Sequence, residues 1–551
     1  MKKSRMAIAG LTVLLMLGVS PFAVAQDKPK KAEISILISA NPPKVTFDES
    51  EYGKQILANQ NVTLSIEYVA KDAQAREGLM VASGEFPDLV SPTSNSADNA
   101  GMGLFLKNKA FIPLDDLVAK YGTNIKKIYP GNALDKFKKN GKLYFLPTQP
   151  GWSNTNIIGG VGYWIQIAVL KDAGYPKITT VAEYFKLLEN YMKKNPTING
   201  KNTIAFEFQS DGWKFDSITN TAALAFGYQD DGGFLVDVNG KKATAKLYFG
   251  AENDKKNLKF LNEAFSRGLI DPECFVDKFD QFSAKITSGR VLGTKGWGYE
   301  LNNINSSLSK QGMDERRFIY LPLVWEAGIQ EKYANYAIPE QNAGIGITKS
   351  AKDPVRIMQF LDSLYSEDNI RLVQWGVKDV DYSVDKNGKY FYTPDQLTVS
   401  MDASYSQKKG LRNATNGITG IPSTFVYSDG NIISPILTKE VQTQAYLPIE
   451  KEALAAYGVV RRGDLFKWFN PIYGMGWSVN INADPEASKA SIKKVDLVTR
   501  TVPRIIMDKP TSFDANWKEY TDKLSQINLK AIESYVSMML TKRLEDGRTG
   551  E

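Results

Sequence analysis

The stretch ISILIS at residues 34–39 opens the pattern that decides the fold of this chain. Its apolar character predicts a buried strand, and strand and helix signals alternate after it: a helix at 51–58, a strand at 64–69 (LSIEYV), a helix at 72–83 and a short strand at 88–90 (DLV). This β–α–β–α–β spacing predicts a parallel sheet with helices on both faces. Ligands of open α/β sheets bind beyond the carboxyl ends of the strands, so a site is expected there.

A second unit begins after Leu146-Pro147. Thr180 and Glu183 form a capping box, which marks the start of a helix. The apolar residues that follow share one face of that helix: Val181, Tyr184, Leu188, Tyr191 and Met192. Further helices are predicted around residues 258–265, from Asp353-Pro354 and from residue 514. Because Trp375 and Trp517 lie in helical patterns, we expect both in the core.

The N-terminus has the layout of an export signal. Lys2, Lys3 and Arg5 precede an apolar run at residues 6–19, and the small residues Ala23-Val24-Ala25 follow. We expect a signal peptide at residues 1–25 and a Lys-rich linker at 26–32. The alternative is an uncleaved membrane anchor, although the Ala-Val-Ala end favours cleavage. The mature protein is then expected to be exported and soluble.

The composition excludes several classes of function. The 551 residues include no histidine and one cysteine, Cys274. A Ser-His-Asp triad, a His-ligated zinc and a histidine pH switch are therefore excluded, and one thiol supports neither a disulfide framework nor a thiolate metal site. The net charge of +7 is small for this length and gives no support for a nucleic-acid partner.

Several motifs together resemble the extracellular solute-binding proteins (family 1) of ABC sugar importers, in particular the large oligosaccharide-binding branch. The resemblance covers most of the chain, and its motifs occur in order at residues 83–90 (SGEFPDLV), 111–117 (FIPLDDL), 141–147 (GKLYFLP), 164–176, 268–272 (GLIDP), 344–350 and 376–388. It implies an α/β fold, the type II two-lobe periplasmic-binding-protein fold, in which hinge crossovers join the lobes and a ligand cleft lies between them. The expected parts are lobe 1 at 33–147, lobe 2 at 148–320, a return segment of lobe 1 at 321–370, and lobe 2 with C-terminal helices at 371–551.

The chain departs from this family in two places. Many relatives have a lipobox cysteine after the signal peptide, whereas the nearest cysteine here is Cys274, so a periplasmic or extracellular protein without a lipid anchor is expected. Some large relatives also carry a calcium loop. The segment at that place, residues 195–201, has no Asp ligand, and SVDKNG at 383–388 fits a hairpin turn better. We therefore expect no cofactor and no metal.

Exposed aromatic rings with polar neighbours are what sugar capture requires, because flat rings cover the C–H faces of pyranoses and polar groups pair with the hydroxyls. Trp297 is the strongest candidate, since sugar-binding relatives place a cleft aromatic after a segment like Ser288-Gly289-Arg290. Trp164 and Trp468 match ligand-facing positions in relatives. Each candidate has packing, loop capping or a surface ion pair as its alternative role. The complete set of predicted ligand-binding residues is Trp152, Asn154, Trp164, Asp211, Trp213, Trp297, Tyr299, Glu300, Arg412, Trp468 and Trp477.

The leading hypothesis is a monomeric, non-enzymatic receptor that captures an oligosaccharide and delivers it to the membrane subunits of an ABC importer. A secreted glycoside hydrolase is the main alternative, because a carboxylate pair drawn from Asp230, Asp231, Glu300 and Glu326 would suffice for that reaction. A glycan-binding adhesin is the third hypothesis. Whether the sugar is neutral or acidic stays open, since Arg290, Arg412, Arg461 and Arg462 are all candidates to pair with a uronate.

Overall fold

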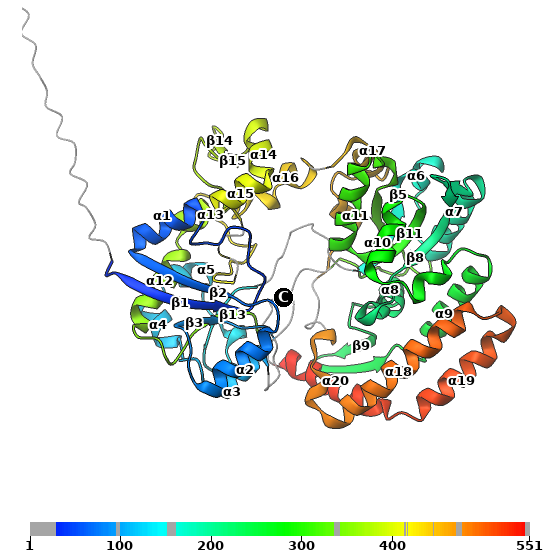
Figure 1. The fold of residues 1–551 in the computed structure, drawn as a ribbon, viewed down its shortest axis with the longest axis horizontal. Coiled ribbons are helices and arrows are strands. Elements are labelled where there is room, and N and C mark those ends of the chain that lie inside the picture. The colour runs from blue at the N-terminus through cyan, green and yellow to red at the C-terminus, as the bar shows by residue number, and fades with distance from the viewer. Residues whose placement is uncertain are drawn as a thin grey trace, which may run out of the picture.

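The computed structural model describes residues 29–94, 100–150, 161–334, 342–412, 415, 417–444, 446–469 and 476–545. These residues form two lobes, each with its own sheet and its own buried core (Figure 1). Lobe 1 is drawn on the left of the figure and lobe 2 on the right. Along the described residues, the chain changes from one lobe to the other three times: after β4, between β12 and β13, and after residue 437.

The sheet of lobe 1 confirms the predicted alternation. Its order is β2-β1-β3-β13-β4, built from β1 (Ala32–Ile38), β2 (Val62–Tyr68), β3 (Leu89–Ser91), β4 (Leu146–Pro147) and β13 (Gly344–Ile347). β1 pairs in parallel with β2 and β3, whereas β13 is antiparallel to β3 and β4. The accompanying helices are α1 (Glu51–Gln60), α2 (Ala73–Ser83), α3 (Gly101–Lys107), α4 (Asp115–Tyr121), α5 (Thr123–Ile128) and α12 (Pro354–Leu364).

Lobe 1 extends further along the chain than expected. Beyond residue 370 it includes α13 (Glu367–Gln374), the hairpin of β14 (Ser383–Val384) and β15 (Tyr390–Phe391), α14 (Pro394–Met401) and α15 (Ala403–Lys409). Trp375 is buried, as predicted, and its core also holds Ile418, Tyr427 and Ile433. The described residues of 371–437, expected in lobe 2, therefore pack on lobe 1, whereas residues 321–334, expected in the return segment of lobe 1, belong to the lobe 2 core.

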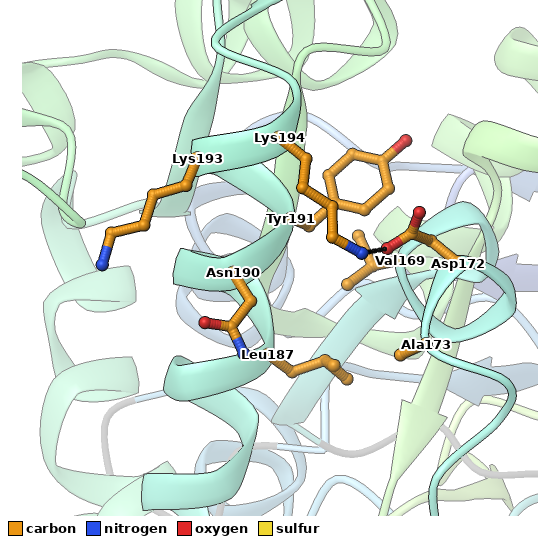
Figure 2. A pocket seen from close by; sticks show the side chains of 8 residues that line it. All are labelled: Val169, Asp172, Ala173, Leu187, Asn190, Tyr191, Lys193 and Lys194. Carbon is orange, nitrogen blue, oxygen red and sulfur yellow. Dashed lines mark hydrogen bonds and ion pairs between the residues drawn. The ribbon is translucent and has the colours of Figure 1, made fainter.

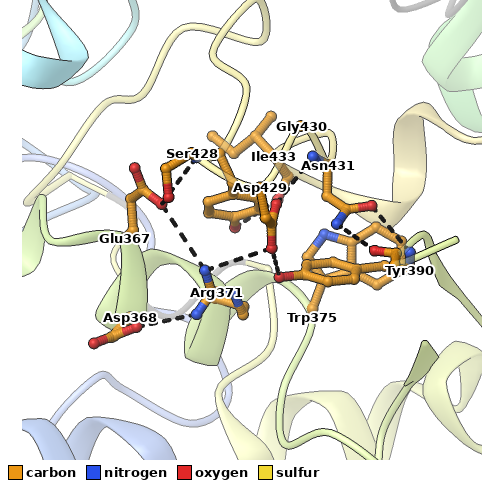
Figure 3. A network of polar contacts seen from close by, with 12 residues as sticks. Glu367, Asp368, Arg371, Trp375, Tyr390, Ser428, Asp429, Gly430, Asn431 and Ile433 are labelled. Carbon is orange, nitrogen blue, oxygen red and sulfur yellow. Dashed lines mark hydrogen bonds and ion pairs between the residues drawn. The ribbon is translucent and has the colours of Figure 1, made fainter.

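A network of hydrogen bonds and ion pairs joins α13 to the loop around Asp429 (Figure 3). Arg371 pairs with Asp368 at 3.0 Å and with Asp429 at 4.0 Å, and its guanidinium lies 5.1 Å from the ring centre of Tyr427. Glu367 accepts hydrogen bonds from the backbone N–H and the hydroxyl of Ser428. These contacts hold the loop around Asp429 against lobe 1.

Lobe 2 has a four-stranded mixed sheet in the order β12-β5-β11-β8, formed by β5 (Val161–Gln166), β8 (Ile204–Phe208), β11 (Val291–Trp297) and β12 (Phe318–Leu321). β11 is parallel to β8, and β5 is antiparallel to both β11 and β12. Thr180 and Glu183 form the predicted capping box at the start of α7. The helices here are α6 (Ile167–Asp172), α7 (Val181–Lys194), α8 (Ser217–Ala225), α9 (Glu252–Ser266), α10 (Phe279–Thr287) and α11 (Gly298–Lys310).

The C-terminal part completes lobe 2 after α16 (Lys439–Gln444). α17 (Pro448–Ala456) packs near α6, and the long helices α18 (Pro485–Met507), α19 (Phe513–Ser525) and α20 (Leu529–Glu545) cover α9 and the hairpin of β9 (Phe234–Asn239) and β10 (Lys242–Leu247). Trp517 belongs to this core, as predicted. Within the described part of the chain, we find no helix with the length and apolar content that a bilayer crossing requires.

Candidate functional site

The carboxyl ends of β8 and β11 bring several predicted residues together. The two strands are parallel neighbours, and Lys295 of β11 lies opposite Phe208, the last residue of β8. β8 leads into a short 3-10 helix, Gly212–Asp216, which continues into α8, whereas β11 ends at Trp297 and leads directly into α11. The loop after β8 therefore meets the start of α11, as expected for a site beyond the carboxyl ends of parallel strands.

Two tryptophans meet at this edge. The rings of Trp213 and Trp297 lie 4.8 Å apart between centroids, with an interplanar angle of 63°. Trp213 is 61% exposed and Tyr299 is 53% exposed, while Trp297 is partly buried against the lobe 2 core. Neighbouring exposed rings form an apolar patch, and contiguous apolar patches are typical of sites that bind a ligand or a partner.

Lys214 lies at the centre of this cluster. Its Nζ is 4.3 Å from the ring centre of Trp213 and 4.2 Å from that of Trp297, within the range of cation–π contacts. The same ammonium donates to the hydroxyl of Tyr299 at 2.9 Å and forms an ion pair with Glu300. We call these five residues, Trp213, Lys214, Trp297, Tyr299 and Glu300, the tryptophan site.

Burial divides the tryptophan site into a charged base and an aromatic surface. The side chains of Lys214 and Glu300 are 8% and 7% exposed, whereas Trp213 and Tyr299 are largely exposed. Such an arrangement presents apolar ring faces that a buried ion pair holds in place. Lys214 was not predicted from the sequence, because a lysine beside an exposed tryptophan has the pattern of a solvated side chain.

Asp211 lies on the same loop, just before the 3-10 helix, and pairs with Lys278 at 2.6 Å. The loop is anchored one residue earlier, where Ser210 Oγ donates to the carbonyl oxygen of the buried Cys274 at 2.7 Å. This fixes the position of the chain between Phe208 and Trp213.

Trp477 is 55% exposed and is held against the loop that follows α8. The backbone N–H of Gly476 donates to Asp231 Oδ1 at 2.8 Å, and the backbone at Gly232 approaches Trp477 closely. Asp230, in the same loop, accepts a hydrogen bond from Asn220 of α8 at 3.0 Å, and burial raises the pKa of its carboxyl to about 6. Trp213 thus lies just before α8 and Trp477 lies against the loop that follows it, and α8 is drawn on the side of lobe 2 that faces lobe 1 (Figure 1).

Three predicted residues lie elsewhere. Trp164 is 3% exposed, because β5 lies in the middle of the sheet. Its ring stacks on that of Tyr320, with 4.9 Å between the ring centres, and its indole N–H donates to the carbonyl oxygen of Gly296. Trp468 is partly buried on the lobe 2 core and donates to the carbonyl oxygen of Gly463. Arg412 is in lobe 1, where its guanidinium donates to Ser400 Oγ and Ser406 Oγ. Trp152 and Asn154 lie outside the described residues.

The carboxylates considered for hydrolysis are engaged or dispersed. Glu300 is paired with Lys214, and Asp231 accepts from the backbone of Gly476. Glu326 is on the surface, 4.0 Å from Lys256. Glu300 and Asp231 therefore serve in structural contacts, and Glu326 lies on the surface.

The segments considered for calcium form hairpins. Residues 197–202 pair as β6 (Thr197–Ile198) and β7 (Lys201–Asn202), and both central turn residues, Asn199 and Gly200, have positive φ, as in a tight two-residue hairpin turn. The predicted hairpin at 383–388 is confirmed by the pairing of β14 with β15. Across the residues described, no three His, Cys, Asp or Glu side chains are grouped as a metal site would require.

A pocket of about 300 Å³ lies away from the tryptophan site, between α6 and α7 (Figure 2). An ion pair between Lys194 and Asp172, at 2.8 Å, closes one side of it. Tyr191 is the one aromatic residue of its lining, and its hydroxyl accepts from Arg316. This pocket lacks the exposed ring faces of the tryptophan site.

No protein-family model matches the chain. Among curated proteins, it is 29% identical over 224 residues to the fructooligosaccharide ABC transporter substrate-binding protein FusA of Streptococcus pneumoniae. That match covers 39% of this chain and about 40% of the length of the relative.

The structural likeness is far more extensive. An extracellular solute-binding protein from Bifidobacterium longum subsp. infantis superimposes with a TM-score of 0.64 and 17% identity, covering 94% of this chain and 98% of its own. An EF-hand mutant of the S. pneumoniae protein FusA in complex with fructo-nystose gives a TM-score of 0.62 and 17% identity, over 93% and 99% of the two chains. The chain therefore has the two-lobe α/β fold of the solute-binding proteins, as the sequence motifs predicted.

Proposed function

We propose that this protein is the extracytoplasmic substrate-binding protein of an ABC importer and that it captures an oligosaccharide at the tryptophan site. The single observation that carries the proposal is the pair of tryptophans at the carboxyl ends of β8 and β11, one of them 61% exposed on a buried ion pair. Flat apolar faces of this kind suit the C–H faces of sugar rings. The matched protein FusA is named as a substrate-binding protein for fructooligosaccharides, which agrees with this ligand class.

The remaining predictions extend this proposal. The protein is exported under the signal at residues 1–25, acts as a monomer without a cofactor, and delivers the ligand intact to the importer's membrane subunits. Of the predicted ligand contacts, Trp213, Trp297 and Tyr299 are the ones that the proposal requires, with Asp211 and Trp477 as neighbours on the same edge and at the far end of α8. Hydrolysis is disfavoured because Glu300 is committed to Lys214.

Calorimetric titration of the purified protein with neutral and acidic oligosaccharides tests the proposal. We expect Trp213→Ala to weaken binding by ~2 kcal/mol, about 30-fold, as for a central aromatic contact. Phe391→Ala, which removes a 41% exposed ring from the β15 hairpin of lobe 1, is the matched control and should leave binding unchanged.

Chromatography of the ligand after incubation separates the receptor from the hydrolase. The receptor returns the oligosaccharide at its original length, and shortened products would contradict the proposal. A panel of oligosaccharides in which no member binds would contradict it as well.

A further inference from the structure

The ammonium at the centre of the tryptophan site is already neutralised. Lys214 pairs with Glu300, donates to Tyr299 and is enclosed by the rings of Trp213 and Trp297. Turning this ammonium toward a ligand would leave Glu300 buried without a partner, which is strongly unfavourable. Lys214 is therefore committed to holding the rings and is not available as a charge for a ligand.

The neighbouring lysines are committed in the same way. Lys278 pairs with Asp211 at 2.6 Å. Behind the loop, Lys285 pairs with Asp271 at 2.8 Å and with Glu273 at 2.7 Å. Each of these lysines has at least one carboxylate partner among the described residues. Lys295, two residues before Trp297, has none, but it is 1% exposed and is therefore out of reach of a ligand.

The arginines that the sequence offered for a uronate are also engaged. Arg290 donates to the carbonyl oxygen of Asn202 at 3.1 Å, and Arg412 is bound to Ser400 and Ser406 in lobe 1. Arg461 pairs with Asp464 at 2.8 Å, and Arg462 pairs with the buried Glu450. All four guanidinium groups thus have partners outside the tryptophan site.

We propose that the tryptophan site selects uncharged oligosaccharides, with Lys214 and Glu300 as the positioning residues that orient its rings. This inference rests on the proposed function and names the substrate class of that site. A uronate carboxylate bound there would lose its hydration and meet charges that already have partners, because the described residues offer no accessible unpaired cation to compensate it. A neutral sugar face needs only the rings and hydrogen-bonding partners.

The direct test compares one ligand in two charge states. The tightest neutral oligosaccharide is converted chemically to its C6 carboxylate, and both forms are titrated calorimetrically at about 0.05 and 0.5 M NaCl, between which the screening length changes severalfold. We expect the carboxylate form to bind at least about tenfold more weakly and the neutral form to show no salt dependence. Equal or tighter binding of the carboxylate form overturns the selectivity but leaves the proposed function standing. Failure of both forms to bind refutes the proposed function.

Glu300→Gln tests the role of the ion pair. It leaves Lys214 with an uncompensated charge, so affinity for the carboxylate form should rise by about tenfold, the strength of one charge-assisted contact. Glu519→Gln makes the same charge change on the exposed surface of α19 and should alter neither affinity. The double variant Lys214→Met/Glu300→Gln contains neither charge and should keep the preference for the neutral form. An equal change for both ligands in Glu300→Gln contradicts the proposal.

Discussion

Lys295, two residues before Trp297 at the carboxyl end of β11, is buried without a partner among the described residues. It is 1% exposed, and no described group lies within hydrogen-bonding distance of its Nζ. Its ammonium lies 5.6 Å from the ring centre of Tyr163 and 5.8 Å from that of Phe208. Burial among these rings lowers the pKa of Lys295 to about 7.

We expect Lys295→Met to stabilise the protein at pH 7. The lysine of the unfolded chain titrates near pH 10, so between pH 7 and pH 10 the unfolded state binds a proton that the folded state does not. Stability of the wild type therefore rises with pH across this window. Methionine removes this cost, and the free energy of unfolding at pH 7 should increase by ~2–3 kcal/mol with a flatter pH profile. Denaturant unfolding of both proteins at several pH values measures this difference in the free energy of unfolding. A Lys295→Met variant that is less stable than the wild type at pH 7 would contradict the prediction.

Gly232 is required by the backbone that supports Trp477. Its φ is +68°, and a Cβ there would lie 2.6 Å from the Cβ of Trp477. Gly232→Ala should displace Trp477, costing ~1–3 kcal/mol of stability and shifting the tryptophan fluorescence. Gly240→Ala is the matched control, because its φ is +60° and nothing lies within 4 Å of the added Cβ. If the two substitutions change stability and fluorescence equally, the contact of residue 232 with Trp477 is not the cause of the effect.

Some of the predicted site residues can be recognised from their neighbours in the sequence, whereas the burial of others depends on segments far away in the chain. Trp213, Trp297 and Tyr299 could be predicted because each lies next to a glycine near a strand end, and this local pattern is visible in the sequence. Trp164 has the same residue type, but its burial comes from two neighbouring strands that are distant in the chain, so local sequence could not reveal it. The burial of Lys214 likewise depends on Glu300, 86 residues away.

At the scale of elements, the open edge of the β9–β10 hairpin is covered by α20. Backbone N–H groups of β10 donate to Thr541 Oγ1 at 3.0 Å, to Ser537 Oγ at 2.9 Å and to Glu533 Oε1 at 3.1 Å. Side chains thus replace a neighbouring strand and protect an edge that would otherwise be unpaired. Local signals such as the Thr180 capping box predicted helix starts, but this docking joins segments almost 300 residues apart and has no local signal.

The double variant Ser537→Ala/Thr541→Val should destabilise lobe 2, because it leaves the N–H groups of Ala243 and Ala245 without partners. Each unsatisfied donor costs ~1–3 kcal/mol when buried. Hydrogen exchange of the β10 amides should accelerate together with a lower melting temperature. Thr521→Val on α19 is the control, since its hydroxyl bonds only within its own helix. Unchanged exchange at β10 would exclude the capping role.

At the scale of the whole molecule, the assignment of segments to lobes depends on long-range packing. The sequence predicted two lobes and their order, but it placed residues 371–437 in lobe 2. The structure shows why this segment belongs to lobe 1: the hydroxyl of Tyr52 in α1 donates to Asp381, Tyr129 donates to the carbonyl oxygen of Gly420 at 2.8 Å, and Lys409 pairs with Glu51 of α1 at 2.8 Å. These partners are separated by loops, so helix and strand periodicity could not reveal which sheet they cover.

Two lobes joined by three chain crossings are suited to hinge closure around a ligand. The tryptophan site lies wholly on lobe 2, so a sugar bound there reaches full enclosure only if lobe 1 moves over it. We therefore expect the radius of gyration from small-angle X-ray scattering to fall on saturation with an oligosaccharide. The variant Trp213→Ala/Trp297→Ala at the same ligand concentration should keep the radius of the free protein. If the wild type binds the sugar calorimetrically while its scattering stays unchanged, closure is refuted and a rigid glycan-binding adhesin becomes the better description.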